Sequence, residues 1–118
     1  MKKLLIAALA TSLLAAVPAH AQTPPPPPTG NVLYEWCTKQ GAVYRSGCDG
    51  YLSGYFDALV SVGSPGFICT PNGTIIAQAK DVLVRWLSSH PEKRHFAAGV
   101  IATGAFMEAW PCPTKSKP

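Results

Sequence analysis

Apolar residues recur at helical spacing along most of the chain, and no stretch alternates convincingly like a β-strand. The clearest helix follows Thr74, which can cap it, and a shorter one follows Asn31 in the same way. Between them, a third pattern runs from about Cys48 to Val62. Together the patterns predict an all-α fold. In chain order, the apolar positions of the three segments are Val32, Leu33, Trp36 and Cys37; Tyr51, Leu52, Tyr55, Phe56, Leu59 and Val60; and Ile75, Ile76, Ala79, Val82, Leu83, Trp86 and Leu87.

A fourth segment, Phe96 to Trp110, is apolar on almost every side. Its roughly fifteen residues fall short of the roughly twenty that a helix needs to cross a bilayer. A short helix that is apolar all round is normally buried among other helices. We therefore expect a small bundle of about four helices with this apolar C-terminal helix at its centre. The polar stretch Gln40 to Gly47 is expected to be a loop between the first two helices.

The first 21 residues have the three parts of a secretory signal peptide. Lys2 and Lys3 form the charged region, Leu4 to Val17 the apolar region, and Ala19-His20-Ala21 the small-residue cleavage site. Cleavage after Ala21 leaves 97 of the 118 residues, in a compartment that we expect to be a bacterial periplasm. A retained membrane anchor is the alternative, and the short apolar run and the good cleavage site disfavour it.

The mature chain is expected to consist of a spacer, one domain and a tail. Residues 22–29 include the five prolines Pro24 to Pro28, which favour an extended polyproline II rod. Such a run can also bind proline-reading domains, but a spacer is the preferred interpretation. One compact helical domain covers 30–112, and 113–118 form a short C-terminal tail.

The net charge of the mature chain is small. Loss of Lys2 and Lys3 leaves eight Lys and Arg against six Asp and Glu, a balance near +2. These charges are too few and too scattered to indicate nucleic-acid binding.

Four cysteines in a short exported domain predict two disulfides, each contributing on the order of 3–4 kcal/mol. Their spacings of 11, 21 and 43 residues include no close pair typical of a zinc knuckle, a thioredoxin-type site or c-type haem attachment. Three connectivities are possible. We favour Cys37–Cys48, which a short helical hairpin brings together, with Cys69–Cys112, which antiparallel third and fourth helices place side by side.

Small residues four apart, Gly50, Gly54 and Ala58, form a row on the second predicted helix. Each glycine lowers helix stability by roughly 1 kcal/mol relative to alanine. The row therefore predicts that another backbone approaches closely. A helix of the same chain is the preferred partner, and the matching helix of a second subunit is the alternative.

No grouping of residues indicates catalysis. The acidic residues are scattered, and no serine lies in a nucleophile-elbow pattern. His90 and His95 lack the further ligands that a metal site would need. We therefore expect no enzyme activity, no metal and no cofactor.

Six motifs follow one another along the mature domain. They are Gly30-Asn31-x-Leu33 ahead of Cys37; Cys48-x-Gly50-Tyr51-x-x-Gly54-x-x-Asp57-Ala58-Leu59; Cys69-x-Pro71; Gln78-x-x-Asp81-Val82-Leu83 leading to Trp86-Leu87; His90-Pro91-Glu92-x-Arg94-His95; and Ala105-Phe106-x-Glu108-Ala109-Trp110-Pro111-Cys112. In this order they resemble the Rap/Tai family of immunity proteins from type VI secretion systems. The resemblance implies a small periplasmic helical protein, in a family whose members are often dimeric. It also implies inhibition of a peptidoglycan-cleaving amidase effector by occlusion, without turnover.

The effector contact is predicted at the polar turn between the last two helices. Arg94 and Glu92 can make charge-assisted hydrogen bonds to an amidase, or they can simply cap helix ends. The residues of the predicted contact are His90, Pro91, Glu92, Lys93, Arg94 and His95.

Two other classes of function compete with this one. A periplasmic acid-stress chaperone is also small, helical and disulfide-bonded, but it would expose apolar surface on acidification. Only two histidines of the mature chain titrate in the useful range. A saposin-like lipid binder would have to open around lipid, and the predicted Cys69–Cys112 disulfide would restrict such opening.

Overall fold

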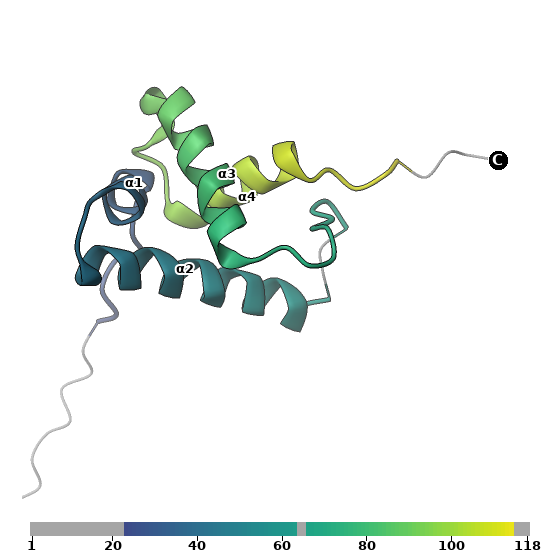
Figure 1. The fold of residues 1–118 in the computed structure, drawn as a ribbon, viewed down its shortest axis with the longest axis horizontal. Helices are drawn as coiled ribbons and strands as arrows, with labels where there is room; N and C mark the ends of the chain where they lie inside the picture. The colour runs from purple at the N-terminus through teal and green to yellow at the C-terminus, as the bar shows by residue number, and fades with distance from the viewer. Residues whose placement is uncertain (1–22, 64–65, 115–118) are drawn as a thin grey trace, which may run out of the picture.

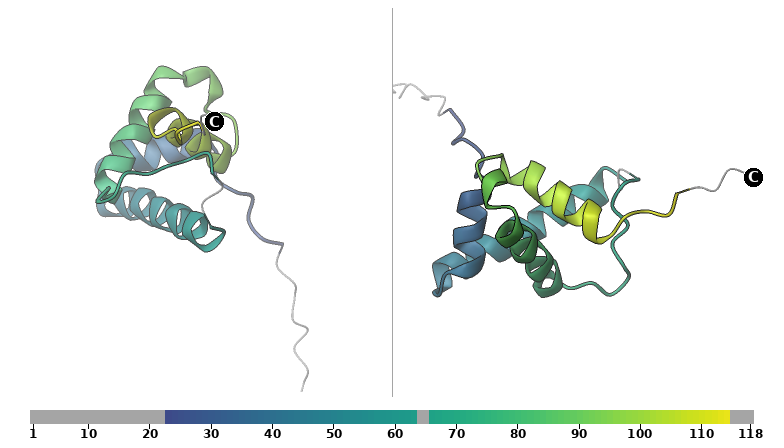
Figure 2. Two further views of the ribbon diagram at one scale, coloured as in Figure 1. Left: turned by 90° about the vertical axis from the view of Figure 1, so that its right-hand side faces the viewer. Right: turned by 90° about the horizontal axis from the view of Figure 1, so that it is seen from above.

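The computed structural model describes residues 23–63 and 66–114, and these residues fold as a bundle of short helices. The helices are α1 (Gly30–Thr38), α2 (Ala42–Ser61), α3 (Ile76–Ser89), the 3₁₀ turn η1 (Pro91–Lys93) and α4 (Ala98–Ala109). α2 lies along one side of the molecule, and α3 leads away from it toward the opposite side (Figure 1). The turned views show α2 beside both α3 and α4 (Figure 2). The predicted all-α fold is confirmed, whereas the predicted signal peptide, 1–21, lies outside the described residues.

The hydrophobic core takes at least one fully buried large side chain from each α-helix. Leu33 of α1, Leu52 of α2, Leu83 of α3 and Phe106 of α4 are all 0% exposed. This shared burial explains why helices of only 9 to 20 residues are stable together.

The C-terminal helix α4 contributes one face to the core and is not enclosed by the other helices. Val100 and Met107 on its outer side are 63% and 42% exposed. Three short neighbours cannot surround a fourth helix, so the apolar outer residues stay at the surface. The buried residues of α4 are Ala98, Ile101, Ala102, Ala105 and Phe106.

Helix α2 begins at Ala42, six residues before the predicted start near Cys48. The expected loop at Gln40 to Gly47 is wrong beyond Gly41, where a positive φ of 120° lets the chain reverse before the helix. Gly47 lies inside the helix. A glycine is needed at this position because a Cβ would lie 3.0 Å from the Trp36 ring. The glycine that suggested a loop thus allows α1 to pack closely on α2.

The predicted helix caps are also wrong in detail. α1 starts at Gly30, whose N–H donates to the carbonyl oxygen of Phe96 at 2.9 Å. The Thr74 hydroxyl donates to the carbonyl oxygen of Pro71 at 2.7 Å and so belongs to the preceding turn. At the start of α3, the Gln78 side chain accepts the N–H of Ile75 at 3.0 Å.

Both predicted disulfides are present. Cys37–Cys48 joins the end of α1 to the second turn of α2, with 5.0 Å between the Cα atoms. Cys69–Cys112 joins the connection between α2 and α3 to the segment after α4, with 4.8 Å between the Cα atoms. The two links therefore fasten opposite ends of the same bundle.

Candidate functional site

The predicted contact residues form one continuous turn between α3 and α4. Pro91 opens the 3₁₀ turn, where its missing N–H leaves no hydrogen bond unmade. His90 stacks on the Trp86 ring with 4.2 Å between centroids, and its Nδ1 lies 2.9 Å from the Trp86 carbonyl oxygen. His90, the residue that follows α3 and begins the turn, is therefore held against the end of that helix.

Arg94 fastens this turn to two helices. Its Nε donates to the carbonyl oxygen of Leu87 in α3 at 2.7 Å, and its guanidinium carbon lies 3.6 Å from the centroid of the Tyr34 ring in α1. The carbonyl oxygen of Arg94 accepts the N–H of Asn31 at 2.8 Å. The half-buried Arg94 side chain thus positions the turn, which agrees with the helix-capping alternative for this residue.

The outward surface of the turn includes three charged or polar side chains. Glu92, Lys93 and His95 are exposed, and the His95 ring packs on Phe96 with 4.2 Å between centroids. The Nζ atom of Lys93 lies 5.5 Å from the Trp86 ring centroid. The turn therefore presents a mixed-charge surface on a backbone that is hydrogen-bonded to α1 and α3.

The row Gly50, Gly54 and Ala58 is exposed on α2. Figure 1 shows this helix across the molecule from the turn between α3 and α4. Among the described residues, no atom from elsewhere in the fold comes within 4 Å of a Cβ placed at Gly50 or Gly54. Close packing of this row within the chain, the preferred prediction, is therefore wrong. Its use between two subunits stays a prediction.

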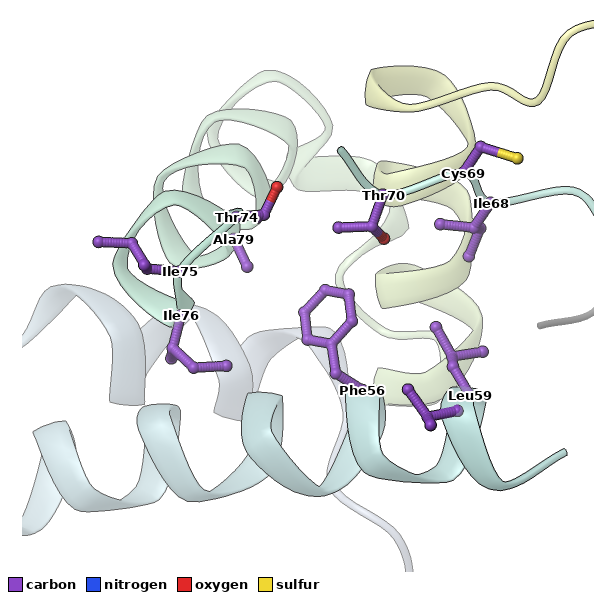
Figure 3. A pocket seen from close by; sticks show the side chains of 10 residues that line it. Phe56, Leu59, Ile68, Cys69, Thr70, Thr74, Ile75, Ile76 and Ala79 are labelled. Carbon is purple, nitrogen blue, oxygen red and sulfur yellow. The ribbon is translucent and has the colours of Figure 1, made fainter. Parts of the chain in front are cut away.

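A groove that the sequence did not predict opens between α2, the start of α3 and the connection between them (Figure 3). Its volume is about 770 Å³. Phe56 and Leu59 rise from α2 on one side, and Ile68 faces them from the connection (Figure 3). Val60 and Ile75 at its edge are 76% and 61% exposed. We call this the apolar groove; its lining residues are Phe56, Leu59, Val60, Ile68, Cys69, Thr70, Thr74, Ile75, Ile76 and Ala79.

A sequence signal for the groove existed in the width of two apolar faces. On both predicted helices, the apolar positions spread over more of the circumference than a core-facing stripe requires. In the structure Leu52 and Ala79 are buried, whereas Val60 and Ile75 remain open. Which apolar residues stay exposed depends on the distance between α2 and α3, which only the tertiary structure shows.

Two tyrosines connect α2 to α4. The Tyr55 hydroxyl lies 2.9 Å from the Thr103 hydroxyl, and the Tyr51 hydroxyl approaches Gly99. Burial raises the pKa of both tyrosine hydroxyls, and the hydrogen bond to Thr103 partly offsets this at Tyr55. These groups therefore serve as neutral, packed side chains and not as acids near neutral pH.

Cation-binding and membrane-spanning features are absent from the described ranges 23–63 and 66–114. Within them, no group of three or more His, Cys, Asp or Glu residues is arranged to hold a metal ion. No helix in the same ranges combines the length and apolarity that a membrane span requires.

The fold defines a small disulfide-linked helical protein with a charged turn and an apolar groove on its surface. Residues 29–112 match the family model of the Rap1a immunity proteins, so the chain belongs to this family. It is thus an immunity protein, whose role implies binding a cognate secreted effector. The family and the disulfides indicate an extracytoplasmic protein. No curated protein and no solved structure matches the chain significantly.

Proposed function

We propose that this protein binds and occludes a peptidoglycan-cleaving amidase effector of a type VI secretion system in the periplasm of the producing cell. Family membership supports the immunity role, and the resemblance of the six motifs supports an amidase as the target. The two disulfides support an oxidising compartment. The predicted signal peptide supplies the route of export.

The observation that carries the proposed contact is the way Arg94 holds the turn. A backbone fixed in advance loses little conformational entropy on binding, so more of the contact energy appears as affinity. Glu92, Lys93 and His95 are exposed on this fixed backbone. We therefore assign the contact with the amidase to these three side chains and a positioning role to Arg94.

The first experiment captures the partner. Tagged mature protein is mixed with the secreted and periplasmic fractions of its own organism, and bound proteins are identified by mass spectrometry. Stoichiometric recovery of one amidase, followed by loss of its peptidoglycan cleavage on addition of this protein, supports the proposal. Recovery of many unrelated proteins that increases on acidification instead supports the chaperone alternative.

A charge exchange then tests the turn. Glu92→Lys with Lys93→Glu keeps the net charge and should weaken the amidase complex at least about tenfold by removing charge-assisted contacts. The matched control is Glu35→Lys with Lys39→Glu, which exchanges the partners of an exposed ion pair on α1. If both variants bind the amidase with the same affinity as the unchanged protein, the turn is not part of the interface.

We also propose that two copies associate through the row Gly50, Gly54 and Ala58. The row is exposed, and its small side chains would let two α2 helices approach closely. Sedimentation of the Gly54→Leu variant tests this. A monomer is expected, and a dimer of unchanged size would exclude the row as the contact.

A further inference from the structure

The two disulfides lie in different surroundings. Cys37 and Cys48 are 6% and 0% exposed and form part of the hydrophobic core. Cys69 is exposed and Cys112 is half-buried, and both lie outside the helices. A reducing thiolate must reach a sulfur atom directly, so access limits the rate of thiol–disulfide exchange. Reduction of Cys69–Cys112 should therefore precede reduction of Cys37–Cys48.

The Cys69–Cys112 link holds one wall of the apolar groove. The connection between α2 and α3 contributes Ile68, Cys69 and Thr70 to this wall. Figure 3 shows the Cys69 sulfur directed away from the groove, while Ile68 and Thr70 line it. The disulfide thus lies behind the wall, where Cys69 is an exposed residue.

Two backbone contacts also attach this wall to the end of α4 and the residue after it. The N–H of Cys69 donates to the carbonyl oxygen of Trp110 at 2.8 Å, and Ile68 forms an isolated β-bridge with Pro111. Ile68 itself is 4% exposed, and among the described residues it is the one core member outside the helices. Both backbone contacts join the wall to the two residues before Cys112, so they and the disulfide hold the same two segments together.

We infer that Cys69–Cys112 is a redox-sensitive link whose reduction opens the apolar groove while the helical core stays joined by Cys37–Cys48. The reductant is a dithiol, either a small molecule or a periplasmic oxidoreductase with a cysteine pair. Its thiolate bonds to one sulfur of the link and releases the other as a thiolate. The second thiol of the dithiol then attacks this mixed disulfide and releases the remaining protein cysteine. The dithiol is thereby oxidised to a disulfide, and the link is reduced to two thiols.

Opening follows from the loss of the cross-link. Residues 66–75, the part of the α2–α3 connection next to α3, then keep the backbone contacts of Ile68 and Cys69 and the burial of the Ile68 side chain. Movement of Ile68 away from Phe56 and Leu59 would expose apolar surface of the groove to solvent. The buried Cys37–Cys48 link and the side chains of the four helices would keep the rest of the core intact.

Stepwise reduction of the mature protein with dithiothreitol tests this inference. Samples are quenched with an alkylating reagent, and the labelled cysteines are mapped by mass spectrometry. Cys69 and Cys112 are expected to be labelled at least about tenfold faster than Cys37 and Cys48, because access controls the exchange. Binding of a hydrophobic dye should rise together with this first labelling, while the helical circular dichroism stays unchanged.

Two paired variants make the test specific. Cys69→Ser with Cys112→Ser should bind the dye without reductant and keep its helical signal, whereas Cys37→Ser with Cys48→Ser should still need reductant. Labelling of all four cysteines together would overturn the inference. The inference would also be overturned if Cys69 and Cys112 were labelled first without a rise in dye binding. Dye binding that appears only when helix content is lost would overturn it as well. None of these readouts depends on the identity of the effector.

Discussion

The Nε atom of Arg94 donates a hydrogen bond to the carbonyl oxygen of Leu87, at 2.7 Å. This carbonyl lies in the last turn of α3, where helix carbonyls lack partners within the helix. The same guanidinium covers the Tyr34 ring of α1. One side chain thus satisfies a helix end and connects two helices to the turn that follows.

Replacing Arg94 should reduce stability through both contacts. We expect Arg94→Ala to lower the free energy of unfolding by about 2 kcal/mol, since a charged hydrogen bond and a cation–π contact are lost. Arg94→Lys should recover only part of this, because an ammonium group lacks the planar shape that stacks on Tyr34. Urea unfolding of the two variants measures the difference, and an unchanged midpoint for Arg94→Ala would contradict the role assigned to Arg94.

Two glycines on different helices should respond oppositely to alanine. At Gly30, a Cβ would lie 2.9 Å from the carbonyl oxygen of Arg94, so Gly30→Ala should cost about 1–3 kcal/mol by overpacking. At Gly54 nothing within the described part of the chain lies near, so Gly54→Ala should stabilise the helix by up to about 1 kcal/mol. Chemical unfolding at low protein concentration separates this effect from self-association. Destabilisation by Gly54→Ala would indicate a contact at the row.

Neighbouring residues of α4 should differ sharply in their contribution to stability. Phe106 is fully buried, with ring centroids of Phe56 and Trp110 at 5.0 Å and 5.3 Å. Phe106→Ala should cost about 3–5 kcal/mol, whereas Met107→Ala on the exposed side should cost less than about 1 kcal/mol. Thermal unfolding of both variants compares them directly. Similar losses would mean that the outer side of α4 is covered in solution.

Alkaline pH should weaken the contact between α2 and α4. Burial raises the pKa of Tyr51 and Tyr55, so the folded protein holds these protons more tightly than the unfolded chain, where the pKa is about 10. Their contribution is fully present below about pH 10 and is lost as pH rises through the folded pKa values. Urea unfolding from about pH 8 to about pH 12 should show this fall, and Tyr51→Phe with Tyr55→Phe should flatten it. An identical slope in the double variant would exclude these tyrosines as the cause.

The sequence determined the class of the protein and much of its framework. Helical periodicity predicted three helices, because an apolar stripe must be buried whatever its partner is, and a short run of apolar residues predicted the fourth. Of three possible connectivities, the expected helix ends favoured the two disulfides that are present, because a short hairpin and an antiparallel helix pair bring those cysteines together. The ordered motifs from Gly30 to Cys112 led to the immunity family, which the match over 29–112 confirms.

Other features depended on how the helices pack, which no local pattern encodes. Gly47 was predicted to lie in a loop, but it lies in α2, where the Trp36 ring leaves no room for a larger side chain. Val60, Ile75 and Val100 looked like core residues, yet their exposure depends on the distance between helices and on how few helices share the core. For Arg94 the sequence left an effector contact and helix capping open, and only tertiary structure brought it to Leu87 and Tyr34, residues 7 and 60 positions away in the chain. Side-chain type and spacing determine which residues can be buried, whereas burial itself is decided by the neighbours that the fold supplies.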